Sequence, residues 1–171
     1  MATPTYIPLA TVTLAVASSS VFFTSISQDY SDLVLVWDKV FSGGTNQVNT
    51  LLSFNGDSGN YETVWMYGNG TSASSGYSPA QQRLAWSSIY TTADTDSTQG
   101  TAQIIGYSAT DKHKTTLFRA NVIGQNAVGA QAHASRWAST AAVTSLSISS
   151  SVDSFAAGAT FKLFGIHGEV V

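Results

Sequence analysis

Hydrophobic and polar residues alternate along most of this 171-residue chain. Successive side chains of a strand point to opposite faces, so a period of two is typical of a strand with one wet face. Val12, Leu14 and Val16, for example, alternate with Thr13 and Ala15. The pattern predicts strands over Tyr6–Val16, Ser20–Ile26, Leu33–Val40, Gln47–Asn55, Tyr61–Tyr67, Arg83–Tyr90, Thr101–Tyr107, Thr115–Ile123, Val128–Trp137, Val143–Ser149 and Thr160–Ile166.

Segments rich in glycine, asparagine and serine separate these strands. Asn55-Gly56-Asp57 and Asn69-Gly70 are typical of tight turns, because asparagine and glycine tolerate a positive φ. Ser72–Pro79 and Thr91–Gly100 are predicted to be longer polar loops. No helical period is long enough to predict a helix. Many short strands at regular spacing predict an all-β fold, a two-sheet antiparallel β-sandwich of jelly-roll type.

Composition restricts the partners of such a fold. The chain has 25 serines and 20 threonines, only 10% charged residues, and a formal net charge of −3. Because nothing resembles a basic patch, we expect no binding to nucleic acid. A surface with few charges is poorly protected against self-association. We therefore expect other protein chains to cover much of this surface.

The length and the N-terminal pattern predict one domain over residues 1–171 that needs no covalent cross-link. The chain contains no cysteine, so disulfides and thiolate metal sites are excluded. No basic residue precedes Lys39, and Pro8–Phe23 alternates like a strand, so we expect neither a signal peptide nor a membrane span. Residues 1–9 are uncharged and contain Pro4 and Pro8. We expect this segment to anchor the protein on a neighbouring chain.

One motif resembles the surroundings of a catalytic serine. Gly56-Asp57-Ser58-Gly59 has the letters of a serine-protease nucleophile, but that mechanism needs a histidine base, which precedes the serine in the chymotrypsin-like order. All three histidines, His113, His133 and His167, follow Ser58. The sequence therefore predicts a turn at this motif and no catalytic residue.

Metal-binding patterns are weak. Asp94–Gly100 has the acidic spacing of a calcium loop, but Gln99 stands where an EF-hand needs glycine. A looser ion site built from Asp57, or from Asp94 and Asp96, stays open at this stage. No second ligand lies at zinc-like spacing from a histidine. We therefore predict no metal-binding residue, no cofactor and no enzymatic activity.

Each aromatic residue either packs in the core or contacts a partner, and the tyrosines beside turns are the best candidates for contacts. Tyrosine provides a large contact area at low entropic cost, and three tyrosines lie beside turns rich in glycine and asparagine. An N-terminal tyrosine lies in the segment expected to anchor the chain. The predicted partner-contact residues are Tyr6, Tyr61, Tyr67 and Tyr77.

Six groups of segments resemble, in order, a family of small jelly-roll bacteriophage virion proteins. They are Tyr6–Thr11 with Thr13-Leu14, Val21–Ile26 followed by Tyr30–Leu35, Leu52–Asp57, Met66–Gly70, Arg136–Val143 and Thr160–Ile166. The family comprises capsid decoration (cement) proteins and tail or fibre components. The resemblance implies a non-enzymatic homo-oligomer, with three chains the commonest number, and offers no catalytic motif.

The resemblance and the composition together give an expected function. We expect a decoration protein made in the host cytoplasm and located on the particle surface, where it binds the major capsid protein or another virion protein and stabilises the head. The alternative is a tail-fibre or receptor-binding module that binds host-surface glycans through aromatic and amide side chains.

Overall fold

The computed structural model describes residues 5–42, 47–81, 84–90, 97–123 and 128–167. The regular structure of these residues consists of strands, so none of them belongs to a helix long and apolar enough to cross a membrane. The strands are β1 (Tyr6–Thr13), β2 (Ser20–Phe23), β3 (Asp32–Ser42), β4 (Gln47–Phe54), β5 (Tyr61–Gly68), β6 (Ala73–Gln81), β7 (Leu84–Tyr90), β8 (Ser97–Ile105), β9 (Lys114–Ile123), β10 (Val128–Trp137), β11 (Leu146–Ser150), β12 (Ser154–Phe155) and β13 (Thr160–Ile166).

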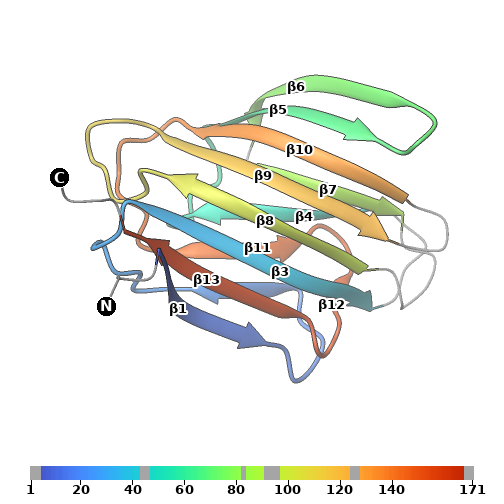
Figure 1. The fold of residues 1–171 in the computed structure, drawn as a ribbon, viewed down its shortest axis with the longest axis horizontal. Helices are drawn as coiled ribbons and strands as arrows, with labels where there is room; N and C mark the ends of the chain where they lie inside the picture. Colours follow the sequence, from blue (N-terminus) through green and yellow to red (C-terminus); the bar gives the residue numbers. More distant parts are fainter. Residues whose placement is uncertain (1–4, 43–46, 82–83, 91–96, 124–127, 168–171) are drawn as a thin grey trace.

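Two antiparallel sheets pack against each other (Figure 1). The large sheet has the order β1-β13-β3-β8-β9-β10-β5-β6, with the short β12 paired to β3. The small sheet has the order β2-β11-β4-β7. The predicted all-β, two-sheet antiparallel sandwich is confirmed.

The pairing of strands explains why this sandwich is a jelly roll. The first strand pairs with the last, β1 with β13, and inside this pair lie β2 with β11, β3 with β8 and β4 with β7. These pairs are successive parts of one long antiparallel ribbon. Rolling up the ribbon places its pairs alternately in the two sheets. We call these strands the jelly-roll core.

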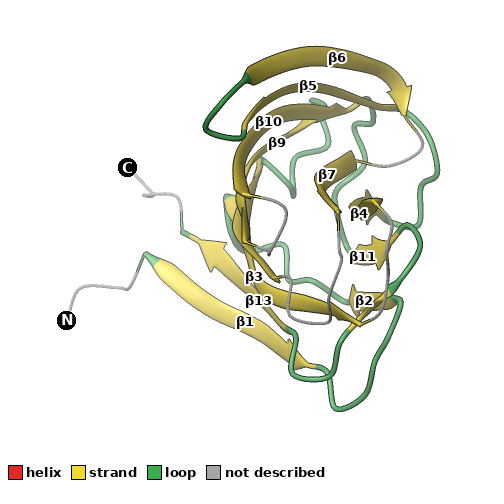
Figure 2. Cartoon of the chain, turned by 90° about the vertical axis from the view of Figure 1, so that its right-hand side faces the viewer, coloured by secondary structure: helices red, strands yellow, loops and turns green. Residues whose placement is uncertain are grey.

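The remaining long strands extend the large sheet. β5 and β6 form a hairpin inserted between β4 and β7, and β9 and β10 form another between β8 and β11. The two hairpins meet where β10 pairs with β5. Figure 2 shows the large sheet curving around the small one, with β6 at one end and β1 at the other. We call β5, β6, β9 and β10 the extension.

Alternating apolar residues form the hydrophobic core between the sheets. In β13, Phe161 and Leu163 are buried while Lys162 between them is exposed. Trp37 of β3 is also buried and packs against Phe118 of β9, with ring centroids 5.9 Å apart. Burying a side chain of this size contributes roughly 1.5–3 kcal/mol. Core packing therefore continues from the jelly-roll core into the extension.

Both edge strands of the large sheet carry a proline. Pro8 lies in β1 and Pro79 in β6. Proline lacks an N–H donor and interrupts further pairing, so it is tolerated on edge strands and protects them from uncontrolled strand addition. The ladder is also irregular there, with register shifts between Pro8 and Ala10 in β1 and between Tyr61 and Thr63 opposite β6.

The main departure from the predicted strands is β6. Ser72–Pro79 was predicted to be a loop, but Ala73–Gln81 is a strand paired with β5. β8 likewise begins at Ser97, inside the loop predicted over Thr91–Gly100. Both segments are rich in serine, threonine and glycine and carry almost no apolar alternation. Their pairing with a neighbouring strand makes them strands, and local sequence does not reveal it.

Part of the N-terminal segment lies in the first strand of the large sheet. Tyr6, Ile7 and Pro8 belong to β1 and pair with Ile166, Gly165 and Phe164 of the same chain. Tyr6–Leu9 of the segment expected to anchor on a neighbour are therefore part of the protein's own sheet. Residues 1–4 lie outside the described residues, and an anchoring role for them stays a prediction.

Candidate interaction surface

The outward face of the extension forms a regular grid of side chains. Residues that pair directly across neighbouring strands point to the same face of a sheet. The printed registers of β6 with β5, β5 with β10 and β10 with β9 therefore define two adjacent rows. One row is Tyr77, Val64, Ala134 and Leu117, and the next is Ser75, Met66, Ala132 and Arg119. We call these eight residues the outer patch.

Large apolar side chains of the outer patch are exposed to solvent. The exposed fractions are 52% for Val64, 60% for Met66, 59% for Tyr77 and 45% for Leu117. Isolated exposed apolar residues are common, but a contiguous group of them on one sheet face is typical of an interaction site.

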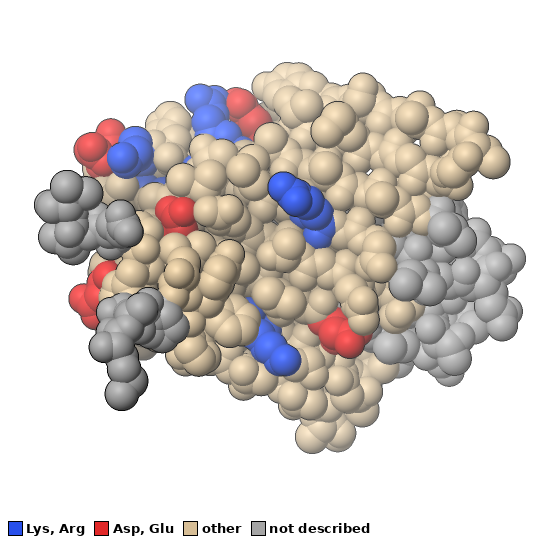
Figure 3. Space-filling view, viewed as in Figure 1, with Lys and Arg blue, Asp and Glu red and all other residues tan. Residues whose placement is uncertain are grey.

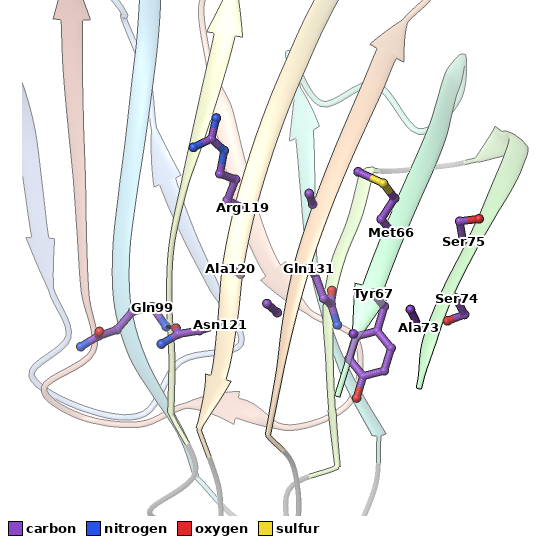
Figure 4. A pocket seen from close by; sticks show the side chains of 13 residues that line it. Met66, Tyr67, Ala73, Ser74, Ser75, Gln99, Arg119, Ala120, Asn121 and Gln131 are labelled. Carbon is purple, nitrogen blue, oxygen red and sulfur yellow. Dashed lines mark hydrogen bonds between the residues drawn. The ribbon is translucent and has the colours of Figure 1, made fainter. Parts of the chain in front are cut away.

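Small residues on β10 create a depression in this face. A shallow trough of about 810 Å³ runs over Ala130 and Ala132 (Figure 4). Met66 and Ser75 line one side of the trough. Gln99, Arg119 and Asn121 line the other side. The outer patch therefore has a ridge on β5 next to a floor of alanines on β10.

Charged groups are sparse on this side of the molecule (Figure 3). Arg119 is exposed within the patch, and no ion pair joins it to another described residue. At the end of the same two strands, Arg136 of β10 and Glu62 of β5 form an ion pair with an Nη2–Oε1 distance of 2.8 Å. Arg119 is therefore the one charged side chain of the outer patch, and the ion pair beside the patch places opposite charges on β5 and β10.

The inward face of the extension holds the patch in place through glycines beneath aromatic rings. A Cβ atom on Gly76 would lie 2.5 Å from the Trp65 ring, and one on Gly129 would lie 2.7 Å from the Tyr67 ring. Each ring therefore occupies the space over the glycine of the neighbouring strand, where a larger residue would place its side chain. Thr63 Oγ1 and Ser135 Oγ, 3.0 Å apart, share a buried hydrogen bond between β5 and β10.

The four predicted contact tyrosines have different environments. Tyr77 lies in the outer patch and Tyr67 is half-buried on the opposite face. Tyr6 is 55% exposed and its ring meets Phe164 edge to face, with centroids 6.4 Å apart. Tyr61, in contrast, is fully buried and stacks on Trp137. The expectation that Tyr61 contacts a partner is corrected, whereas the other three remain accessible.

The serine-protease-like motif is a structural turn. Asn55 and Gly56 both have positive φ, and the Asp57 N–H donates to the Phe54 carbonyl at 2.8 Å, as in a type I′ turn. Asp57 accepts hydrogen bonds from Trp137 Nε1 at 2.6 Å and from the Gly59 N–H at 3.0 Å. The pKa of the Asp57 carboxyl is lower than its ordinary value, and the hydrogen bond from Trp137 is the main cause. The motif therefore fastens β4 and β5 to β10.

The other candidate ligands are also placed by the fold. Asp94 and Asp96 lie outside the described residues. His113 is exposed, and the rings of His133 and His167 contact Phe118 and Tyr30 at centroid distances of 4.3 and 5.0 Å. Among the described residues, no three histidine, aspartate or glutamate side chains are grouped as metal ligands.

Lys114 is a buried cation that the sequence analysis missed. Its Nζ donates to the carbonyls of Lys112 and Thr140 at 2.9 and 3.3 Å. Burial is the main cause that lowers its pKa from the ordinary value, as expected when a charge loses water. The ammonium joins two loops of the backbone.

The sequence also contained an unused signal for the outer patch. Both faces of β5 are apolar, since Tyr61 and Trp65 alternate with Val64 and Met66. A strand that is apolar on both faces contacts the core with one and needs a cover for the other.

No family model, no curated protein and no solved structure matches the chain.

Proposed function

We propose that this chain is a non-enzymatic structural protein of a bacteriophage particle. It associates with itself and decorates the capsid, where it binds across neighbouring capsid subunits and stabilises the shell. The observation that carries this proposal is the outer patch, in which four large apolar side chains are 45–60% exposed on one face of the large sheet. Covering such a surface with another protein is favourable because it removes apolar area from water.

The charge distribution supports an interfacial role. The chain has 7 basic and 10 acidic residues in 171, and Arg119 is the one charged residue among the eight of the outer patch. Depletion of charge at the centre of a surface is a compositional mark of protein interfaces. Permanent association with another protein would stabilise such a surface by removing its apolar side chains from water.

A jelly roll by itself does not select a function, because the same fold carries many. The ordered segments that resemble phage virion proteins support the choice of a virion. Asp57 and Lys114 both form hydrogen bonds within the fold. This structural use of the two groups supports a non-enzymatic role. The proposed partners are the major capsid protein or another virion protein, and further copies of this chain, three as the resemblance implies.

Quantitative mass spectrometry of purified particles tests the proposal. A decoration protein is expected in hundreds of copies per particle, and particles lacking it should release their DNA at a lower temperature. If the chain is absent from purified particles, the proposal is wrong.

The trough supports a second candidate, a fibre module that binds host glycans. Gln99, Asn121 and Arg119 offer amide and guanidinium groups beside an alanine floor that admits the apolar face of a sugar ring. This candidate predicts at most a few dozen copies per particle and binding of the purified protein to host-surface polysaccharide. Arg119→Ala should then reduce polysaccharide binding without changing the copy number.

A further inference from the structure

We infer that two copies of this chain pack against each other, outer patch to outer patch. The two copies are related by a two-fold axis that runs parallel to the strands. This axis lies over the outward face of the sheet, between β5 and β10. The inference deepens the proposed self-association by assigning it a surface and a geometry. It rests on the register of four strands and on the size and charge of the side chains that the register places together.

The two-fold axis brings each residue of β5 opposite its own cross-strand neighbour on β10 of the second copy. This follows because rotation about an axis between two strands exchanges their positions, as in any isologous contact. In this arrangement Val64 lies over Ala134 of the second copy. Met66 likewise lies over Ala132 of the second copy.

The sizes of these residues are complementary at each position. The side chains of Val64 and Met66, 52% and 60% exposed, lie over the small alanines of β10, of which Ala132 lines the trough. Figure 4 shows Met66 beside this floor, with Arg119 beyond it on β9. Shape complementarity of this kind is what a specific interface needs, because unfilled gaps lose van der Waals contacts.

The outer strands of the patch are complementary as well. β6 of one copy lies over β9 of the other, so Tyr77 meets Leu117 of the second copy and Ser75 meets Arg119 of the second copy. The first contact is apolar, and the second gives the guanidinium a hydroxyl acceptor. No two cations of the patch are opposed.

Charge supports the same axis. Glu62 and Arg136 are direct cross-strand neighbours, so the rotation places Glu62 of each copy opposite Arg136 of the other. The 2.8 Å ion pair within each chain would thereby join a cluster of two acids and two bases at one end of the interface. Had both strands carried the same charge there, the arrangement would be repulsive.

The area of the patch sets the expected strength. Four strands about 4.8 Å apart and roughly seven residues long cover about 450 Å² on each copy. The total of about 900 Å² is near the lower limit for a specific interface, so we expect a dissociation constant in the micromolar range. An isologous contact also requires an even number of chains, such as a dimer or two trimers joined face to face.

Sedimentation velocity of the purified full chain over the micromolar range tests the surface. We expect concentration-dependent association that Met66→Asp weakens by at least about tenfold, since a carboxylate would be buried on alanine. Ala134→Tyr is a second variant that should weaken association, because the tyrosine ring would occupy the space over β10 that the second copy needs. Tyrosine is common in strands, so this variant should still fold. Phe22→Asp is the matched control, because Phe22 is 62% exposed but lies in β2 of the small sheet. It should leave association unchanged.

A size exchange tests the geometry. Val64→Ala leaves a gap over Ala134 of the second copy, and Ala134→Val makes two valines collide, so each variant alone should weaken association. The double variant carries alanine on β5 and valine on β10 and should regain most of the lost affinity. We expect this recovery of affinity only if the two-fold axis lies between β5 and β10, because only then does residue 64 of one copy face residue 134 of the other.

Several results would overturn the inference. These are a monomer throughout the micromolar range, a trimer alone, association that withstands both Met66→Asp and Ala134→Tyr, or no recovery in the double variant. The proposed function is tested separately by the copy number on particles. A chain that decorates particles but never self-associates would remove this inference and the proposed self-association, and would leave the decoration role standing.

Discussion

The jelly-roll core and the extension use the same kind of strand for different purposes. In the core, one face of each sheet packs against the other sheet, as in β13, whose Phe161 and Leu163 are buried. In the extension, β5 buries Tyr61 inward and still exposes Val64 and Met66 outward. The extension is not needed to complete the paired ribbon of the jelly roll. The comparison indicates that the extension shares the hydrophobic core and, in addition, exposes an apolar outward face.

The largest expected effect is the loss of an aromatic side chain from the core. Trp37→Ala should lower the free energy of unfolding by about 3–5 kcal/mol, because Trp37 is almost fully buried and the cavity cannot collapse. The matched variant Trp65→Ala, in the half-buried position of β5, should cost less than half as much. Equal losses in urea denaturation would contradict the division between core and extension.

Two glycines beneath tryptophan rings sharpen the same comparison. A Cβ on Gly100 of β8 would lie 2.3 Å from the Trp37 ring and 2.6 Å from the Arg119 carbonyl oxygen. On Gly76 of β6 its three nearest atoms would all belong to the Trp65 ring, the first at 2.5 Å. A half-buried ring next to an edge strand shifts more easily than backbone. Gly100→Ala should therefore cost about 2–3 kcal/mol and Gly76→Ala about 1 kcal/mol. Thermal unfolding that ranks them in the opposite order would refute this account.

Asp57, at the junction of the two regions, should make stability depend on pH. Its pKa is lower in the folded chain than the ordinary 3.8, chiefly through the Trp137 hydrogen bond. The carboxylate's contribution is therefore complete above the unfolded value and is lost as the pH falls through the lower folded value.

Asp57→Asn should cost about 1–2 kcal/mol at neutral pH, since it replaces charged hydrogen bonds by neutral ones. The difference from the wild type should shrink as the pH falls below 3.8. Urea denaturation at several pH values measures it. A difference that is independent of pH would show that the charge is not involved.

The smallest effect is expected on the outer patch. Val64→Thr should change the free energy of unfolding of the single chain by no more than about 0.5 kcal/mol, because the side chain is already exposed. Val48→Thr, the same change at a fully buried position of β4, should cost about 1–3 kcal/mol, since it buries a hydroxyl. Measuring both below the association range separates the chain's own stability from self-association.

The sequence by itself determined most of the strands and the class of fold. Alternation of apolar and polar residues, as in Phe161, Lys162 and Leu163, depends only on the period of an extended backbone and was sufficient to predict β13 and its neighbours. The turn at Asn55-Gly56 was also predictable, because few residues accept a positive φ. These features are local, and local sequence carries them.

Only the tertiary structure decided the features that depend on pairing. β6 has too little apolar alternation to be recognised and becomes a strand because it pairs with β5. Tyr61 was expected at the surface, but the sandwich encloses it beside Trp137. The outer patch exists because Val64 and Met66 stand in register with Ala134 and Ala132, residues about 70 positions away in the sequence. Register between distant strands is set by the whole sandwich, so no single segment of the sequence contains it.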